Sequence, residues 1–257
     1  MIAPHMRPRI QLPDSDGQPM ADNTLQYEWI STLKWGLELL FAARHDVFVA
    51  GDHLIYPVMP DPGADVETEV VRFAPDVYVA FGRPKGYRGS YKVWEEYDIF
   101  PQVVFEVWSP SNRPQQMDEK RAAYEEYGAE EYYIVYPEHP AFVEGWVRRD
   151  GQFVQLDNLK DWISPRLGIR FQLDRGHLSV IRPDGTPFLT YLELADQRTD
   201  ARARAQDATD RAEQEANRAE HERARAEHEA KRAESAEQRA ERLAAKLREL
   251  GLDPDAG

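Results

Sequence analysis

The sequence predicts an α/β protein with a mixed β-sheet core flanked by helices, followed by a long C-terminal α-helix that could form a coiled coil. Two observations lead to this prediction. The segments follow the order helix, several strands, helix, two strands, which favours a mixed sheet over repeated βαβ units. All Trp, Tyr and Phe residues lie before Asp196. From Asp196 onward the chain has no aromatic residue, and an Ala- and charge-rich repeat begins there. We therefore expect a globular domain and a helical appendage.

The globular part begins with an amphipathic helix, expected over residues 22–44, with Asp22 or Asn23 as its N-cap. Short apolar runs then predict strands at 47–50, 53–57, 75–81, 103–108, 132–136 and 142–148. A second helix is expected over 116–127, ending at Gly128. Alternating residues at 151–156, 168–171 and 178–181 predict hairpins that close the domain.

The C-terminal segment repeats Arg-Ala-Glu every seven residues. The repeats begin at Arg211, Arg218, Arg225, Arg232 and Arg239. This spacing gives a helix one continuous Ala stripe, so we expect a long helix over 196–250 that stops at Gly251, with Pro254 beyond it. Because Ala buries little apolar area, three alternatives stay open: a weak coiled coil that forms a homo-oligomer, a solitary charged helix, or disorder.

Composition narrows the possible chemistry. The 257 residues include no Cys, which excludes disulfides, thiolate metal sites and Cys nucleophiles. No apolar run approaches the roughly 20 residues of a membrane span, and the start lacks a signal peptide, so we expect a soluble, cytoplasmic protein without a membrane partner. The net charge is −14, and the acid excess lies in the globular part, with 19 basic and 30 acidic residues up to Ala195. This fits a carboxylate metal site, or an ordinary solubilising surface.

The expected organisation has four parts. These are an N-terminal extension at 1–21, the globular domain at 22–195, the long helix at 196–250 and a flexible C-terminus at 251–257.

Two carboxylates stand in strand-like runs. An acid such as Glu106 is costly to bury unless it is paired or binds a cation. If the two runs are neighbouring strands, Asp76 and Glu106 meet at one sheet end and can bind Mg²⁺ or Mn²⁺, and Lys120 on the next helix could orient or polarise a metal-bound water. The alternatives are a turn role for Asp76, an ion pair of Glu106 with Arg113 or Arg121, and a surface position for Lys120.

These segments resemble a known family. The resemblance rests on 74–79 (APDVYV), 104–112 (VFEVWSPSN), 119–121 (EKR), Tyr124, Gly128 and 131–133 (EYY). Over roughly residues 25–144 they are similar to the Uma2 family of restriction endonucleases, within the PD-(D/E)xK nuclease superfamily. The resemblance implies a restriction-endonuclease-like fold. It also implies a Mg²⁺-dependent (or Mn²⁺-dependent) endonuclease that hydrolyses DNA phosphodiester bonds with a metal-activated water.

The resemblance also assigns roles to residues. It implies that Asp76 and Glu106 bind the metal, that the backbone carbonyl of Val107 adds a ligand, and that Lys120 is catalytic. The superfamily has a Lys two residues after the second acid, where this chain has Trp108, so Lys120 is the expected substitute. Glu28 on the first helix is a candidate additional acid.

A second hypothesis for the function stays open. The chain could be a catalytically inactive nuclease-like module for binding or assembly that oligomerises through its C-terminal helix. The acidic body, Trp108 in place of Lys and the prominent tail favour it. The cations of the 83–92 segment could contact a nucleic-acid backbone or could simply be solvated.

Overall fold

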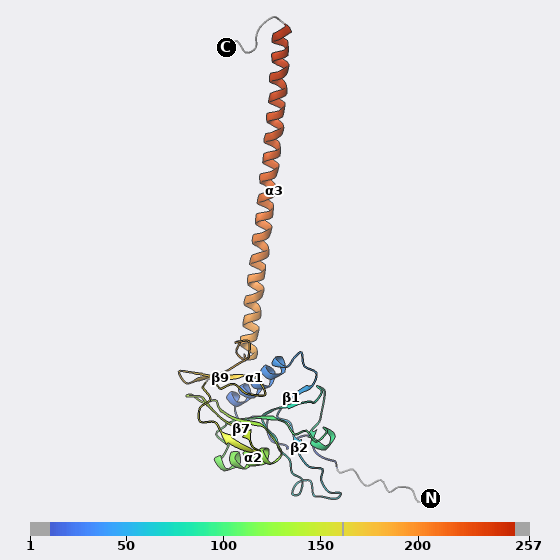
Figure 1. Ribbon diagram of the computed structural model, residues 1–257, viewed down its shortest axis with the longest axis vertical. Coiled ribbons are helices and arrows are strands. Elements are labelled where there is room, and N and C mark those ends of the chain that lie inside the picture. Colours follow the sequence, from blue (N-terminus) through green and yellow to red (C-terminus); the bar gives the residue numbers. More distant parts are fainter. Residues whose placement is uncertain (1–10, 161, 250–257) are drawn as a thin grey trace, which may run out of the picture. The chain divides into compact units, whose positions relative to one another are not determined.

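The computed structural model describes residues 11–160 and 162–249 (Figure 1). The chain divides into two compact units, with the boundary between Glu193 and Leu194, and each unit is described by itself. Within the described ranges, no helix is both long enough and apolar enough to cross a membrane.

The first unit is built around a six-stranded sheet covered by two α-helices (Figure 1). Its elements in chain order are α1 (Thr24–Leu40), β1 (Val47–Gly51), β2 (Ile55–Tyr56), β3 (Val77–Phe81), β4 (Tyr91–Lys92), the 3₁₀ turn η1 (Val93–Glu95), β5 (Val103–Val107), α2 (Pro114–Glu126), β6 (Glu131–Tyr136), β7 (Phe142–Arg149), β8 (Gln152–Gln155), β9 (Arg170–Asp174) and β10 (His177–Ile181).

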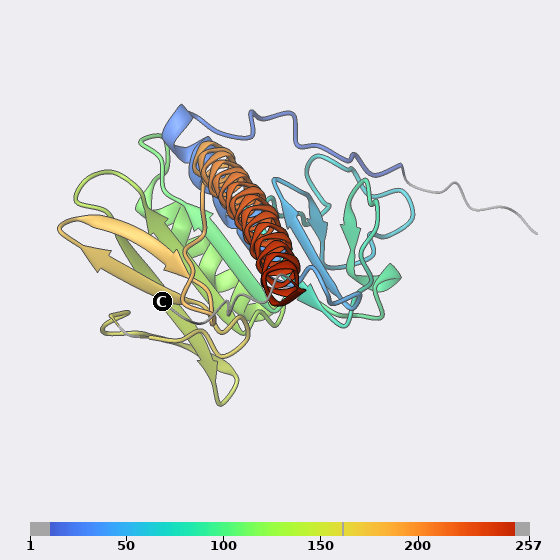
Figure 2. The same ribbon diagram turned by 90° about the horizontal axis from the view of Figure 1, so that it is seen from above.

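The sheet is mixed, as predicted. Its strand order is β1-β3-β5-β6-β7-β8, in which β5 and β6 are parallel and the other neighbouring pairs are antiparallel. A parallel pair needs a crossover connection, and α2 supplies it between β5 and β6. The hairpin β9–β10, yellow to orange in Figure 2, forms a separate two-stranded sheet, and β2 pairs with β4 in another.

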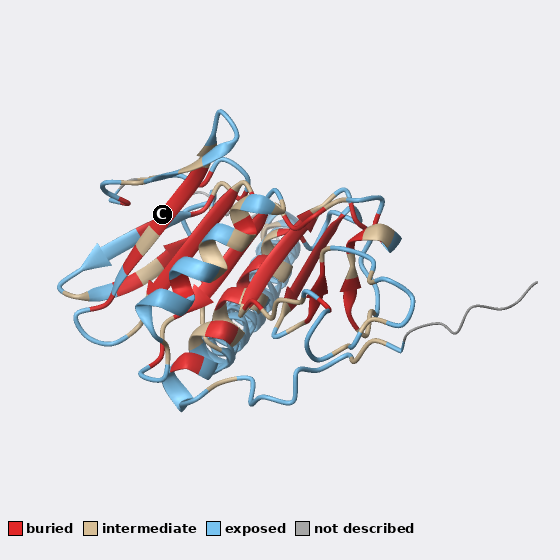
Figure 3. Cartoon of the chain, turned by 90° about the horizontal axis from the view of Figure 1, so that it is seen from below, coloured by how far each residue is buried: buried red, intermediate tan, exposed pale blue. Residues whose placement is uncertain are grey.

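The two helices cover opposite faces of the sheet (Figure 1). On one face, Ile30, Leu33 and Leu37 of α1 pack in the same cluster as Val79 and Phe105. On the other face, the cluster contains Met117 and Tyr124 of α2 with Tyr78, Val104, Tyr132 and Ile134. Strand β5 is therefore buried on both faces, and Figure 3 shows the burial concentrated along the central strands. A charged side chain on this strand is shielded from bulk water and therefore needs a partner within the protein.

The long helix α3 (Tyr191–Glu249) begins in the last residues of the first unit and forms the described part of the second; it has no buried residue. It confirms the predicted long C-terminal helix, but it begins at Tyr191 rather than at 196. The reason is a capping box: the backbone N–H of Thr190 donates to Glu193, and the N–H of Glu193 donates to the Thr190 hydroxyl. Whether α3 pairs with a second copy stays a prediction.

Some expected boundaries shift for local reasons. The strand expected at 168–171 is observed as β9 from Arg170, because Gly168 has φ +68° and belongs to the preceding turn. The predicted helix end at Leu250, the stop at Gly251 with Pro254, the flexible C-terminus at 251–257 and most of the N-terminal extension lie outside the described residues.

Candidate active site

The strand register places the two carboxylates opposite each other. Strands β3 and β5 are antiparallel neighbours, and Val77 faces Phe105. Asp76 directly precedes β3 and Glu106 directly follows Phe105, so both acids lie at the same end of this strand pair. The backbone N–H of Val107 donates to Oδ2 of Asp76 at 2.5 Å, which fixes the aspartate against β5.

Helix α2 supplies two donors to the buried glutamate. Glu106 is 2% exposed. Lys120 Nζ donates to its Oε2 at 2.8 Å, and the Tyr124 hydroxyl donates to its Oε1 at 2.7 Å. Lys120 and Tyr124 are one turn apart on the same face of α2, so both side chains can contact Glu106 at once. The ion pair of Glu106 is thus with Lys120, whereas the alternative partner Arg121 pairs with Asp118 at 2.8 Å.

The structure therefore brings Asp76, Glu106 and Lys120 together. Burial, followed by the negative charge of Glu106, raises the pKa of Asp76 well above its ordinary value, and the charge of Lys120 opposes this shift. Burial alone would lower the pKa of Lys120, but Glu106 outweighs burial and raises it, so this side chain stays an ammonium at neutral pH. With both acids ionised, two carboxylates and one ammonium would leave a local excess of one negative charge.

This electrostatic arrangement fits a hard divalent cation. The ionised form of Asp76 is disfavoured by its surroundings, and a cation between the two acids would relieve the repulsion. The described residues include no cluster of three or more His, Cys, Asp or Glu side chains that could hold an ion. A hard divalent cation commonly keeps several waters and takes one or two carboxylates from the protein, so Asp76 and Glu106 are the residues that would hold it.

The Val107 carbonyl, the expected third ligand, already has a protein partner. Gln26 of α1 is 6% exposed, and its Nε2 donates to Val107 O at 3.0 Å, using one of the two acceptor positions of that oxygen. Glu28, the candidate additional acid, is exposed on α1 and makes no described hydrogen bond to the site. The α1 residue that reaches the site is therefore Gln26.

The turn after β5 is fixed by a second polar cluster that sequence reasoning did not identify. Asp22 accepts hydrogen bonds from the hydroxyls of Ser109 and Ser111, and these two hydroxyls lower its pKa. Asn112 Oδ1 accepts from the Ser109 N–H at 2.8 Å. These bonds join the start of α1 to the start of α2 and hold both helices at the carboxylate end of β5.

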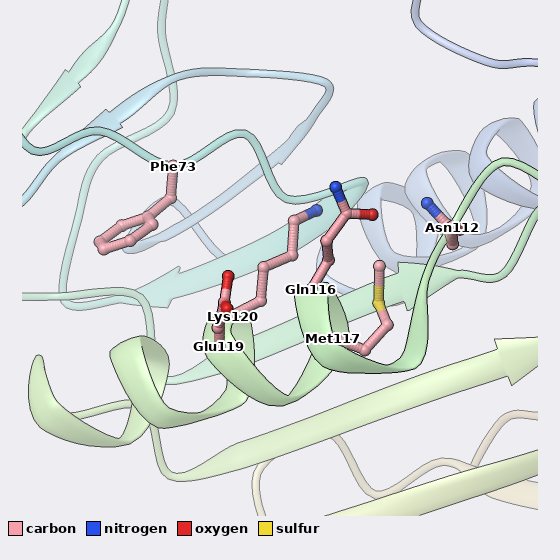
Figure 4. Close-up of a pocket in the computed structure, with 6 residues that line it drawn as sticks. All are labelled: Phe73, Asn112, Gln116, Met117, Glu119 and Lys120. Carbon is pink, nitrogen blue, oxygen red and sulfur yellow. The ribbon is translucent and has the colours of Figure 1, made fainter. Parts of the chain in front are cut away.

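A groove of about 400 Å³ opens beside Lys120 (Figure 4). Its walls are formed by Phe73, Asn112, Gln116, Met117, Glu119 and Lys120. Figure 4 shows Gln116 and Lys120 rising from the same face of α2 toward the strands. A ligand in this groove would lie next to the lysine that contacts Glu106.

The basic 83–92 segment is largely engaged within the protein. Arg83 and Arg88 both donate to Glu96, at 2.6 Å and 2.5 Å, and Lys85 donates to a backbone carbonyl at the end of α1 at 2.9 Å. Three of its four cations thus have internal partners, which favours a structural role over contact with a nucleic acid.

The fold and the grouped side chains define a mixed-sheet α/β domain of the restriction-endonuclease-like type, with acids at a strand end beneath a lysine-bearing helix. A family model described as "Uma2: Putative restriction endonuclease" matches residues 37–184, more than half of the chain, and the chain belongs to this family. The match includes Asp76, Glu106 and Lys120 but neither Gln26 nor α3. The family resemblance expected from the sequence is therefore confirmed.

A similar solved structure is that of a "putative nuclease belonging to DUF820" from Anabaena variabilis ATCC 29413. It is 11% identical, with a TM-score of 0.40, and the similarity covers 58% of this chain and 74% of that one. No curated protein matches the sequence.

Proposed function

We propose that this member of the Uma2 nuclease family is a Mg²⁺- or Mn²⁺-dependent endonuclease that hydrolyses DNA phosphodiester bonds. The observation that supports it most is the convergence, at one end of the sheet, of Asp76 just before β3, Glu106 of β5 and Lys120 of α2. Family membership supplies the nuclease class, and the raised pKa of Asp76 argues for a cation at this place.

Each residue would have a distinct task in this reaction. Asp76 and Glu106 would hold the ion, which supplies Lewis-acid polarisation of the phosphate when it is bound. The Lys120 side chain is 33% exposed, so its ammonium can reach a phosphate oxygen and offset the negative charge that develops there. Tyr124 holds the second oxygen of Glu106 and thereby fixes the orientation of the carboxylate.

The test combines metal binding with cleavage. Asp76→Asn, Glu106→Gln and Lys120→Met are compared with Glu126→Gln, which removes an exposed acid from the end of α2. We expect the parent and Glu126→Gln to cleave plasmid DNA with Mg²⁺ and to give heat on Mn²⁺ titration. The two acid variants should lose both properties, and Lys120→Met should lose cleavage.

Two outcomes would contradict the proposal. Cleavage retained by all three site variants would show that the chemistry lies elsewhere. A parent protein that neither cleaves DNA nor binds Mn²⁺ would favour the inactive binding or assembly module instead.

A further inference from the structure

The groove beside Lys120 presents an unusual set of polar atoms. Two amide side chains line it, Asn112 from the turn after β5 and Gln116 from the first turn of α2. Figure 4 shows the amide nitrogen of Asn112 turned toward Gln116. Neither side chain contacts the carboxylates, and the structural hydrogen bonds that both make use only their amide oxygens.

The orientation of both amides is set by backbone donors. The Ser109 N–H donates to Asn112 Oδ1 at 2.8 Å, and the Arg113 N–H donates to Gln116 Oε1 at 3.2 Å. A backbone N–H can only donate, so each bond must end on the amide oxygen and leaves the NH₂ group on the other side. No described hydrogen bond uses either NH₂ group.

The groove therefore offers donors next to Lys120, whose ammonium adds further ones. Bidentate reading of adenine by Asn or Gln uses both the oxygen and the nitrogen of the amide, and here each oxygen is already directed at a backbone N–H. Phosphodiester oxygens only accept, and they carry no sequence information. A strand that presents its scissile phosphate to Asp76 and Glu106 would bring a neighbouring phosphate toward the groove beside Lys120.

We propose that Asn112 and Gln116 bind the sugar–phosphate backbone of the nucleic-acid strand next to the scissile phosphate, by donating their amide N–H groups to phosphodiester oxygens. The strand is thereby positioned by its backbone, irrespective of base sequence. This inference rests on the proposed nuclease function, since that function brings the strand to this end of the sheet. Phe73, on the opposite wall, provides an apolar surface for a sugar.

The structure suggests substitutions that remove the donors without removing the internal bonds. In Asn112→Asp and Gln116→Glu, a carboxylate oxygen still accepts from the same backbone N–H. A Glu at this helix position is favourable, both in a capping box and for the helix dipole, so folding is preserved. Gln116→Met removes the donor without adding charge, and it also removes the acceptor of the Arg113 N–H. Gln155→Glu makes the same charge change at an exposed position on β8, at the far edge of the sheet from β1.

The experiment measures binding of fluorescein-labelled DNA oligonucleotides by anisotropy, with Ca²⁺ in place of Mg²⁺ and with several base compositions. Losing a hydrogen bond to a charged phosphate should weaken binding about tenfold or more. We expect this for Asn112→Asp, Gln116→Glu and Gln116→Met on every oligonucleotide, while Gln155→Glu stays within about twofold of the parent.

Three results would overturn the inference. The first is that the Asn112 and Gln116 variants bind DNA as tightly as Gln155→Glu does. The second is that Asn112→Asp and Gln116→Glu lose DNA affinity while Gln116→Met does not, because charge repulsion alone would then explain the loss. A loss confined to guanine-containing oligonucleotides would indicate a base-edge contact instead.

A Mn²⁺ titration of the parent separates this inference from the proposed function. A parent that binds Mn²⁺ and cleaves DNA, with groove variants that bind DNA normally, refutes only the backbone contact. A parent that binds no Mn²⁺, with groove variants that still lose DNA affinity, refutes the catalytic function and supports the contact.

Discussion

Replacing Asp76 by Asn is expected to stabilise the metal-free protein while it abolishes stabilisation by metal. The side chain of Asn has the same shape, and its oxygen can still accept from the Val107 N–H. What disappears is a negative charge that is held against Glu106 with little water around it, the cause of the raised pKa of Asp76. Residues that a functional site requires often lower the stability of the folded protein.

The size of the effect has an upper bound. At pH 7 the carboxyl can always take up a proton, so the penalty cannot exceed the cost of protonating a group whose ordinary pKa is 3.8. That cost is about 4 kcal/mol. Because Lys120 offsets part of the repulsion, we expect a gain of about 1–3 kcal/mol in the free energy of unfolding, or roughly 3–10 °C in Tm for a domain of this size.

The pH dependence follows from the direction of the shift. With its raised pKa, Asp76 binds more protons in the folded state than in the unfolded state. The parent therefore loses stability relative to Asp76→Asn as the pH rises above 3.8, and the difference closes toward that value.

The assay is thermal unfolding of both proteins, first with EDTA and then with Mn²⁺. At a Mn²⁺ concentration a hundredfold above Kd the parent should gain about 2.7 kcal/mol, and the variant should gain none. The difference between the Tm values of Asp76→Asn and the parent thus narrows or changes sign when Mn²⁺ is added. If Asp76→Asn is less stable than the parent in EDTA at pH 7, or if Mn²⁺ raises both Tm values equally, the reasoning is refuted.

Three further substitutions test the account. Tyr124→Phe should lower the free energy of unfolding by about 1.5–3 kcal/mol because it removes a donor to a buried carboxylate. Tyr132→Phe is the control and should cost nothing, since that buried hydroxyl has no partner in the described chain. Equal losses for the two variants in urea unfolding would contradict this. Glu96→Gln should cost about 3 kcal/mol at pH 7 by breaking two buried ion pairs. Burial would raise the pKa of Glu96, but its two arginines lower it overall. The ion pairs therefore stabilise the fold above the ordinary pKa of 4.5, and this stabilisation is lost as the pH falls below that value. If denaturation at several pH values gives the same loss of stability for Glu96→Gln, the ion pairs are not its cause. Gly36→Ala should cost about 1–3 kcal/mol, since the new Cβ would lie 2.2 Å from the ring of Phe188, and Phe188→Leu in the same chain should recover part of it; a neutral Gly36→Ala in thermal unfolding would contradict this packing.

The sequence predicts the mixed sheet and the meeting of the carboxylates because both depend on local patterns. Apolar runs mark the strands, and an acid inside such a run demands a partner, which singles out Glu106. Asp76 then follows if the two runs are neighbours, and the observed register of β3 and β5 places the two acids opposite each other. Lys120 required the family resemblance, since a lone lysine on a helix is ordinarily at the surface.

Other contacts depend on tertiary structure and gave weaker signals. Gln26 continues the buried stripe of Ile30, Leu33 and Leu37 on α1, and a polar residue on an apolar stripe is a signal that could have identified it. Nothing in the spacing of Tyr124 indicates that its hydroxyl reaches Glu106. The strands β2 and β4 are only two residues each, too short for any periodicity.

The measurement that tests the central claim most directly is a crystal structure of the protein grown with Mn²⁺, with data collected at the manganese absorption edge. We predict one anomalous peak at the site formed by Asp76 and Glu106, with the ammonium of Lys120 close by. An anomalous map with no peak between the two acids, or with Lys120 still filling that space while Mn²⁺ binds elsewhere, would contradict it.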